Sequence, residues 1–163
     1  MNSWNFKGML AAAIVLPALS GAAWAEGSDD LGCSSATLKG DYAFSVLTIV
    51  SATGPGVVVG LGTFDGRGGF TQTDYPGNGG TDLGLTGFRT GQTGSYTVNP
   101  NCTGFITIDL GATVGTVTNA FVISNGGSAV RAVIAEFTAP DGTLVTPLQS
   151  RIDFWKVASE QDH

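Results

Sequence analysis

The sequence predicts an all-β fold, a single eight-stranded antiparallel β-barrel of the up-and-down type. Short runs rich in Val, Ile, Thr, Phe and Tyr alternate with glycine-containing turns, a pattern typical of sandwiches and barrels. No long stretch has apolar residues at helical spacing. Short turns force successive strands to pair antiparallel, and eight strands can close and remove their edges. An open β-sandwich is the alternative.

Turn signals divide the chain into eight expected strands, each with side chains that alternate between the two faces. In the first strand, Tyr42 and Phe44 share the apolar face, and a similar glycine-x-aromatic unit contains Tyr96. We therefore expect the rings of Tyr42, Phe44 and Tyr96 in the barrel interior. The expected strands cover residues 37–50, 56–64, 69–75, 84–98 (with a bulge or break near Gly91 to Gly94), 103–110, 115–123, 128–138 and 143–157.

Two glycines, Gly60 and Gly62, fall on one face of the second expected strand. Glycine weakens a strand, so its presence there needs a reason. Sharp curvature or close packing against a large ring is one interpretation, and space left for a ligand is the other.

The first 25 residues have the order of a secretory signal peptide. Lys7 precedes an uncharged apolar run at 8–19, and Ala23-Trp24-Ala25 places small residues where a signal peptidase cleaves. The run is shorter than the about 20 residues that span a bilayer. We therefore expect a secreted or periplasmic protein with no membrane span after cleavage of residues 1–25. The remaining chain divides into a flexible N-terminal segment at 26–36, a barrel domain at 37–157 and a C-terminal tail at 158–163.

Both cysteines, Cys33 and Cys102, follow the expected signal peptide. An even number of cysteines in an oxidising compartment predicts a disulfide between them. All 13 acidic residues lie beyond residue 25, with six of the seven basic residues. Because this acidic chain has no basic run, nucleic acid is not an expected partner.

Glycine, aromatic and turn residues recur in three ordered motifs, Leu38-x-Gly40-x-Tyr42-x-Phe44, Gly60-x-Gly62-x-Phe64-Asp65-Gly66-x-Gly68 and Gly94-x-Tyr96-x-Val98-Asn99-x-x-Cys102-x-Gly104. Together they resemble a group of small secreted bacterial proteins, largely uncharacterised, whose fold is similar to the allene oxide cyclase and dirigent barrels of the calycin-like set. The resemblance covers about residues 37–157 and implies a barrel. Because the motifs specify architecture, they carry over no catalytic residue.

The chain offers few catalytic groups. Its only histidine, His163, is the last residue, which leaves no positioned base for a nucleophilic triad and no histidine for a zinc or copper site. Carboxylates are the remaining acid and base candidates. Glu136 shares the parity of the apolar residues before it and is a weak catalytic candidate if it points inward, with Arg89 or Arg151 as its partner. The alternative for the strand carboxylates is an outward side chain paired with a basic neighbour.

No cofactor and no metal site is expected. Asp74, Asn78 and Asp82 flank a glycine-rich loop, but their spacing matches no calcium loop. The chain also lacks a phosphate-binding loop and a dinucleotide motif.

These features favour a non-enzymatic extracytoplasmic barrel that binds a small apolar ligand or acts as an interaction module. An isomerase or cyclase that uses a carboxylate in the barrel is the second hypothesis, by analogy with the resembled fold. A structural component of a surface or matrix is the third. A cavity with an inward carboxylate favours the enzyme, a purely apolar cavity favours the carrier, and a filled barrel favours the structural role.

Overall fold

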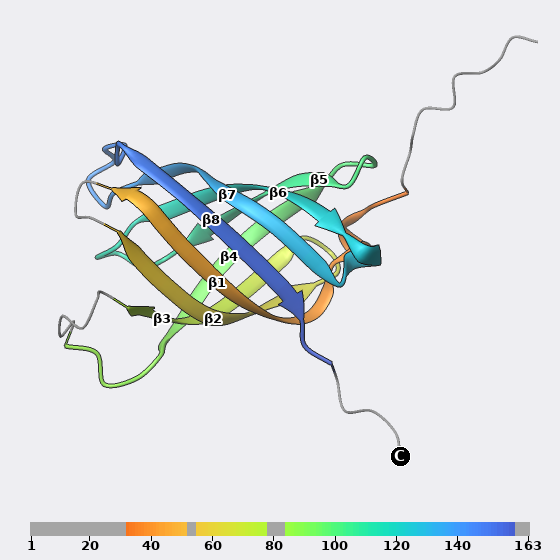
Figure 1. Cartoon of the computed structure of the whole chain (residues 1–163), viewed down its shortest axis with the longest axis horizontal. Coiled ribbons are helices and arrows are strands. Elements are labelled where there is room, and N and C mark those ends of the chain that lie inside the picture. Colours follow the sequence, from red (N-terminus) through yellow and green to blue (C-terminus); the bar gives the residue numbers. More distant parts are fainter. Residues whose placement is uncertain (1–31, 52–54, 78–83, 159–163) are drawn as a thin grey trace, which may run out of the picture.

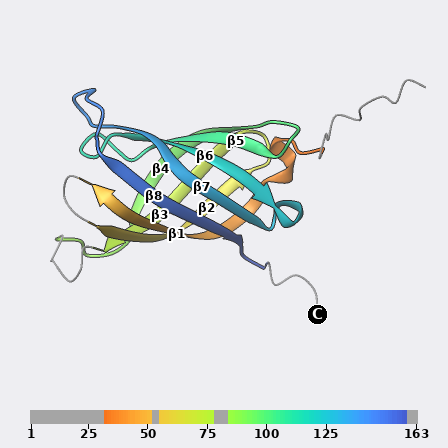
Figure 2. The same cartoon turned by 45° about the horizontal axis from the view of Figure 1, so that its top comes forward.

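The computed structural model describes residues 32–51, 55–77 and 84–158. Its eight strands pair antiparallel in chain order, and the last pairs with the first, so the predicted closed barrel is confirmed (Figures 1 and 2). The predicted signal peptide lies outside the described residues, as does most of the predicted tail. The strands are β1 (Lys39–Ser51), β2 (Gly56–Asp65), β3 (Gly69–Gly77), β4 (Arg89–Val98), β5 (Thr103–Asp109), β6 (Thr116–Ser124), β7 (Ala129–Thr138) and β8 (Leu148–Lys156), with two short 3-10 helices, η1 (Ser35–Thr37) and η2 (Asn125–Gly127).

The up-and-down order gives the barrel two different ends. We call the end with the connections β1–β2, β3–β4, β5–β6 and β7–β8 the mouth, and the opposite end, with η1 and η2, the base (Figure 1). Helix η1 leads into β1 at the base, and the chain leaves the barrel at the same end, after β8. Among the described residues, no helix is long and apolar enough to cross a membrane.

Two strands begin later than predicted. β4 starts at Arg89, and its ladder with β3 shifts register between Gln72 and Asp74. Gly91 adopts a φ of 79° in this stretch, as the predicted bulge requires. β8 starts at Leu148 because the preceding residues fold back on the end of β7, where Leu144 forms an isolated bridge.

β7 and β8 separate near the mouth. Their ladder ends at the pair Ala132–Ile152, although β7 continues to Thr138. Beyond that pair, the backbone N–H of Ile134 donates instead to the Ser150 hydroxyl, at 3.1 Å. We call this region, where the two strands diverge, the seam.

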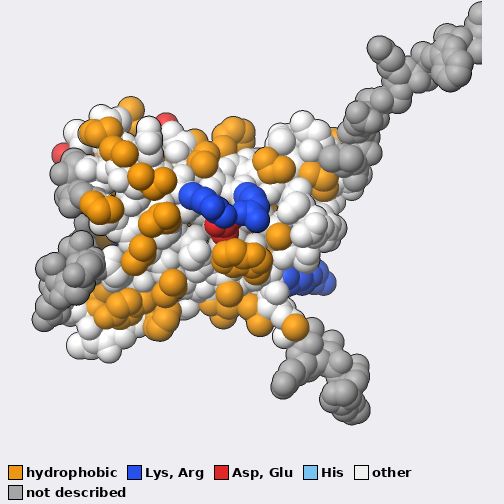
Figure 3. Space-filling view, viewed as in Figure 1, with side chains coloured by type: hydrophobic (Ala, Val, Ile, Leu, Met, Phe, Trp, Pro, Cys, Tyr) orange, Lys and Arg blue, Asp and Glu red, His pale blue; other side chains and the backbone are white. Residues whose placement is uncertain are grey.

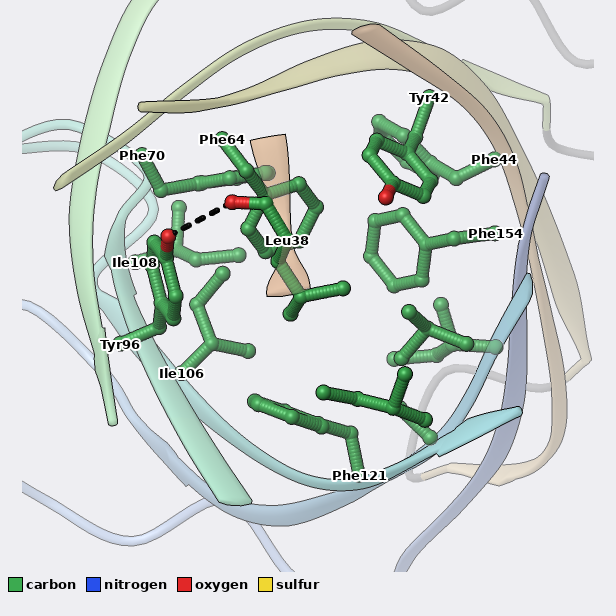
Figure 4. Close-up of a cluster of buried hydrophobic side chains, with 14 of the residues drawn as sticks. Leu38, Tyr42, Phe44, Phe64, Phe70, Tyr96, Ile106, Ile108, Phe121 and Phe154 are labelled. Atoms are coloured by element: carbon green, nitrogen blue, oxygen red, sulfur yellow. Dashed lines mark hydrogen bonds between the residues drawn. The ribbon is translucent and has the colours of Figure 1, made fainter. Parts of the chain in front are cut away.

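Aromatic rings pack against one another in the base half of the barrel. Figure 4 shows this cluster of side chains enclosed by the barrel wall. Phe64 lies at their centre, with its ring centroid 4.7 Å from that of Phe70, 5.1 Å from those of Tyr42 and Tyr96, and 5.9 Å from that of Phe154. Most of these pairs are edge-to-face or tilted, the geometry that ring quadrupoles prefer. The base is therefore a packed core rather than a pore.

The inward glycines of β2 make room for these rings. A Cβ atom on Gly60 would lie 2.4 Å from the Phe44 ring, and one on Gly62 would lie 2.6 Å from the Phe70 ring. Close packing against large rings is therefore the correct interpretation of both glycines. Tyr42, Phe44 and Tyr96 are all buried in the interior, which confirms their predicted placement.

The disulfide and two tyrosine hydroxyls close the base. Cys33 and Cys102 are bonded as predicted, with their Cα atoms 5.0 Å apart. The Tyr96 hydroxyl contacts the backbone carbonyls of Ser35 and Leu38, each at 2.9 Å. The Tyr42 hydroxyl donates a hydrogen bond to the backbone carbonyl of Gly127 in η2. The last residues of the segment predicted to be flexible, 26–36, are thus fixed to the barrel. A buried disulfide fits an extracytoplasmic location.

Burial raises the pKa of both Tyr42 and Tyr96 above the ordinary value of 10.0. Folding therefore favours their neutral forms, and the unfolded chain loses these protons first as the pH rises. We expect the contribution of these two tyrosines to the free energy of unfolding to be constant below pH 10 and to fall as the pH rises above 10. Urea denaturation between pH 8 and pH 11 measures it. Tyr42→Phe should flatten the decline, and a decline of unchanged slope in that variant would show that Tyr42 does not contribute.

Candidate functional site

A cavity of about 130 Å³ occupies the mouth half of the barrel. It arises because the inward side chains become smaller toward the mouth, from Phe44 to Val46 and Thr48 on β1. Most of its wall is apolar and comes from strands all around the barrel. Representative wall residues are Phe44, Val46, Val58, Ile108, Val117 and Phe154.

A charged pair stands on one wall of this cavity. Arg89 Nε donates to Asp74 Oδ1 at 2.7 Å, and Arg89 Nη2 donates to Asp74 Oδ2 at 2.6 Å, a two-pronged ion pair. Asp74 is only 2% exposed. Gln92 donates to the same carboxylate at 3.2 Å, and the Gln72 amide donates to the Gln92 carbonyl oxygen at 2.7 Å. The group is fixed in position and has no net charge.

The local sequence explains how these polar groups enter the barrel. Gln72 and Asp74 continue the inward parity of Phe70 along β3. Arg89 opens β4 just before the bulge at Gly91, and the register shift brings it opposite Asp74. The alternation starting at Phe70 was the signal that could have identified Asp74 from the sequence.

A second polar side chain, Asn119 on β6, lines the cavity. It lies in an otherwise apolar inward row with Val117 and Phe121, and it is 2% exposed. Its side-chain oxygen is buried with no hydrogen-bond partner among the described residues. A buried polar atom without a partner costs about 1–3 kcal/mol, so this oxygen is an acceptor that a donor group of a bound molecule could satisfy.

The prediction that the Glu136 side chain points into the barrel is wrong. A bulge in the β6–β7 ladder pairs Thr118 with Glu136 and Asn119 with Ile134, so Ala135 is an extra residue that reverses the alternation. Glu136 is exposed, where it accepts a hydrogen bond from Thr138 at 3.2 Å. No contact of Glu136 within the described chain supports a catalytic role.

The basic partners considered for Glu136 bind other carboxylates. Arg89 holds Asp74, and Arg151 binds Asp153 at 2.8 Å on the outer face. The outward, paired interpretation is thus correct for Asp153. Within residues 32–51, 55–77 and 84–158, no three acidic, cysteine or histidine side chains gather as a metal site would need. Asn78, Asp82 and His163 lie outside the described residues.

The comparisons with known proteins assign no family. No protein-family model matches the chain, and a search of curated proteins finds no match.

Proposed function

We propose that this protein binds a small, largely apolar molecule in the mouth half of its barrel. The observation that carries the proposal is the cavity itself, which has apolar walls, a fixed ion pair and an Asn119 oxygen without a partner. Binding sites for small molecules combine mostly apolar walls with a few fixed polar groups in this way. An eight-stranded barrel is also just wide enough to hold one small ligand.

The polar groups favour an uncharged ligand. Arg89 and Asp74 neutralise each other, so a charged head group would lose its own hydration and also meet the like charge of one partner. An uncharged hydroxyl or amide can donate a hydrogen bond to the Asn119 side-chain oxygen without that cost. The volume limits the enclosed part of the ligand to about the size of benzene, which fills an apolar protein cavity of roughly 150 Å³.

Two neighbouring valines of β2 provide the test. The side chain of Val58 lines the cavity, whereas that of Val59 points outward and is half-exposed. We expect Val58→Phe to fill the cavity and to abolish retention of a ligand by the protein from its own host, measured by native mass spectrometry. Benzene binding to the purified protein should be lost in parallel. Val59→Phe adds the same volume on the outer face, so this variant should still retain the host ligand and bind benzene.

The proposal is contradicted if the wild-type protein retains no ligand and binds no benzene, or if Val58→Phe binds as the wild type does. Thermal unfolding of both variants checks that each is folded.

Replacement of Asn119 by leucine should separate stability from binding. Asn119→Leu replaces the amide, with its oxygen that has no partner, by an apolar group of the same branched shape, so we expect the ligand-free protein to gain about 1 kcal/mol in the free energy of unfolding. The same variant should bind the host ligand more weakly. Urea denaturation and native mass spectrometry measure the two effects. A loss of stability would show that Asn119 is satisfied in the free protein.

An isomerase or cyclase is a second candidate, because Asp74 is an inward carboxylate on the cavity wall. The resemblance to allene oxide cyclase and dirigent barrels supports the same candidate, as a proposal only. Asp74→Asn should then retain the ligand but stop its conversion, observed as a change in the ligand's structure after incubation. If the wild-type protein also leaves the ligand unchanged, the binding role alone remains.

We also propose that the protein works outside the cytoplasm, secreted or periplasmic, after removal of residues 1–25. The signal-like order of that segment and the disulfide support this location. Because the Cys33 sulfur forms the disulfide, it is not free to carry a lipid. Terminal sequencing of the exported protein should begin at Glu26, and a start at Met1 or at a lipidated Cys33 would overturn the proposal.

A further inference from the structure

The outer face of β5, β6 and β7 carries a shallow groove of about 670 Å³, separate from the mouth cavity. Its floor is Ala120, which pairs with Phe105 on one side and with Val133 on the other. A small residue between two larger ones leaves a hollow in the sheet surface. Phe105, Val133 and the adjacent Val122 are each 52% exposed, so the groove offers apolar walls to solvent.

One end of the groove is basic. Arg131 on β7 and Arg151 on β8 both line it, and both bind the single carboxylate of Asp153, at 2.6 Å and 2.8 Å. Each arginine side chain is 62% exposed, whereas that of Asp153 is 11% exposed. Figure 3 shows basic side chains meeting over an acidic one on this face, with hydrophobic side chains around them.

Within the described part of the chain, this arrangement leaves one positive charge without a carboxylate partner. Two guanidinium groups share one carboxylate, on a chain whose formal net charge is −6. Arg131 contacts Asp153 through Nη1 and Arg151 does so mainly through Nε, so further N–H groups of both remain for another acceptor. Asp153 lies between the two arginines at the edge of the apolar hollow and competes with any added anion for them.

We propose that this groove is a second binding site, for a small amphiphile with one carboxylate and an apolar chain. The carboxylate would accept from Arg131 and Arg151, which suits the two-pronged geometry of guanidinium groups. The apolar chain would lie over Ala120 between Phe105 and Val133. The groove would thus take an anionic ligand, whereas the mouth cavity favours an uncharged one because the charges of Arg89 and Asp74 cancel.

Decanoate is the probe, with decanol and decyltrimethylammonium as uncharged and cationic compounds of the same chain length. We expect calorimetry to show decanoate binding most tightly, with an affinity that falls as salt is raised. Arg131→Gln and Arg151→Gln should each weaken decanoate binding by about fivefold or more, because each removes charge-assisted hydrogen bonds. Arg67→Gln makes the same charge change at an exposed turn of the base and should have no effect.

Two further variants keep the test decisive if an arginine variant loses stability. Asp153→Asn removes the competing carboxylate and should tighten decanoate binding, a gain that unfolding cannot produce. Phe105→Ser should weaken it through the apolar wall.

The proposal is overturned if decanoate binds no better than decanol, or if the arginine variants bind it as the wild type does. It is also overturned if Val58→Phe, which fills the mouth cavity, abolishes decanoate binding. Loss of benzene binding with intact decanoate binding in Val58→Phe would support both sites separately. Failure of either site therefore leaves the other testable.

Discussion

Phe64→Ala should lower the free energy of unfolding by about 3–5 kcal/mol, the usual range for deleting a buried aromatic ring. Phe64 is 2% exposed and contacts four other rings at the centre of the base. The surrounding rings pack closely against the glycines of β2 or are fixed by hydrogen bonds of their hydroxyl groups. They therefore cannot move into the space that the deleted ring leaves. Urea denaturation monitored by fluorescence measures the loss.

Phe44→Ala is the matched comparison, since it deletes the same ring from the same barrel. Phe44 borders the mouth cavity, where water can enter the new space, so we expect a smaller loss than for Phe64→Ala. Binding of the host ligand should also change in Phe44→Ala but not in Phe64→Ala. Equal losses of stability in the two variants would contradict the division into a packed base and a hollow mouth.

Removal of the disulfide should cost about 4 kcal/mol, because it closes a loop between residues 69 positions apart. Besides this restraint on the unfolded chain, the bond holds Cys33 beside the β4–β5 turn, so that η1 stays over the base. The double variant Cys33→Ser with Cys102→Ser should unfold at a correspondingly lower urea concentration. Circular dichroism with and without reductant measures the difference.

Reductant serves as the internal control for this prediction. The wild-type protein in dithiothreitol should unfold at the same urea concentration as the double variant, and the double variant should not respond to dithiothreitol. A double variant as stable as the oxidised wild type would show that packing of the base alone positions η1.

Much of the fold could be predicted because local signals and the global fold agree. Turn residues delimit the strands, and the parity of Tyr42 and Phe44 identifies the inner face of β1 without knowledge of the other strands. The glycines of β2 could be recognised as unusual, although the rings that require them, Phe44 and Phe70, come from neighbouring strands. The pairing of Cys33 with Cys102 could be predicted from their even number and the expected oxidising compartment.

The polar groups of the cavity were harder to predict, for a physical reason. Parity arguments fail after a bulge, and the extra residue Ala135 turned Glu136 outward although the preceding row pointed inward. The partner of a buried charge depends on register between strands, and the shift between β3 and β4 selected Arg89 for Asp74. Asn119 could have been noticed as an amide within an apolar alternation, but the lack of a partner for its oxygen depends on tertiary contacts.

The seam between β7 and β8 bears on how large a ligand the cavity of about 130 Å³ can accept. Moving these strands apart near the mouth breaks the contact between Ile134 and Ser150, but no β7–β8 ladder pair beyond Ala132–Ile152. Ile134 and Ile152 border the cavity and Ser150 faces inward beside them, so such an opening enlarges the cavity directly. Of the eight neighbouring pairs of strands, β7 and β8 share the shortest ladder. We therefore expect a ligand wider than the cavity to displace β7 from β8 at the seam, while the aromatic base stays unchanged.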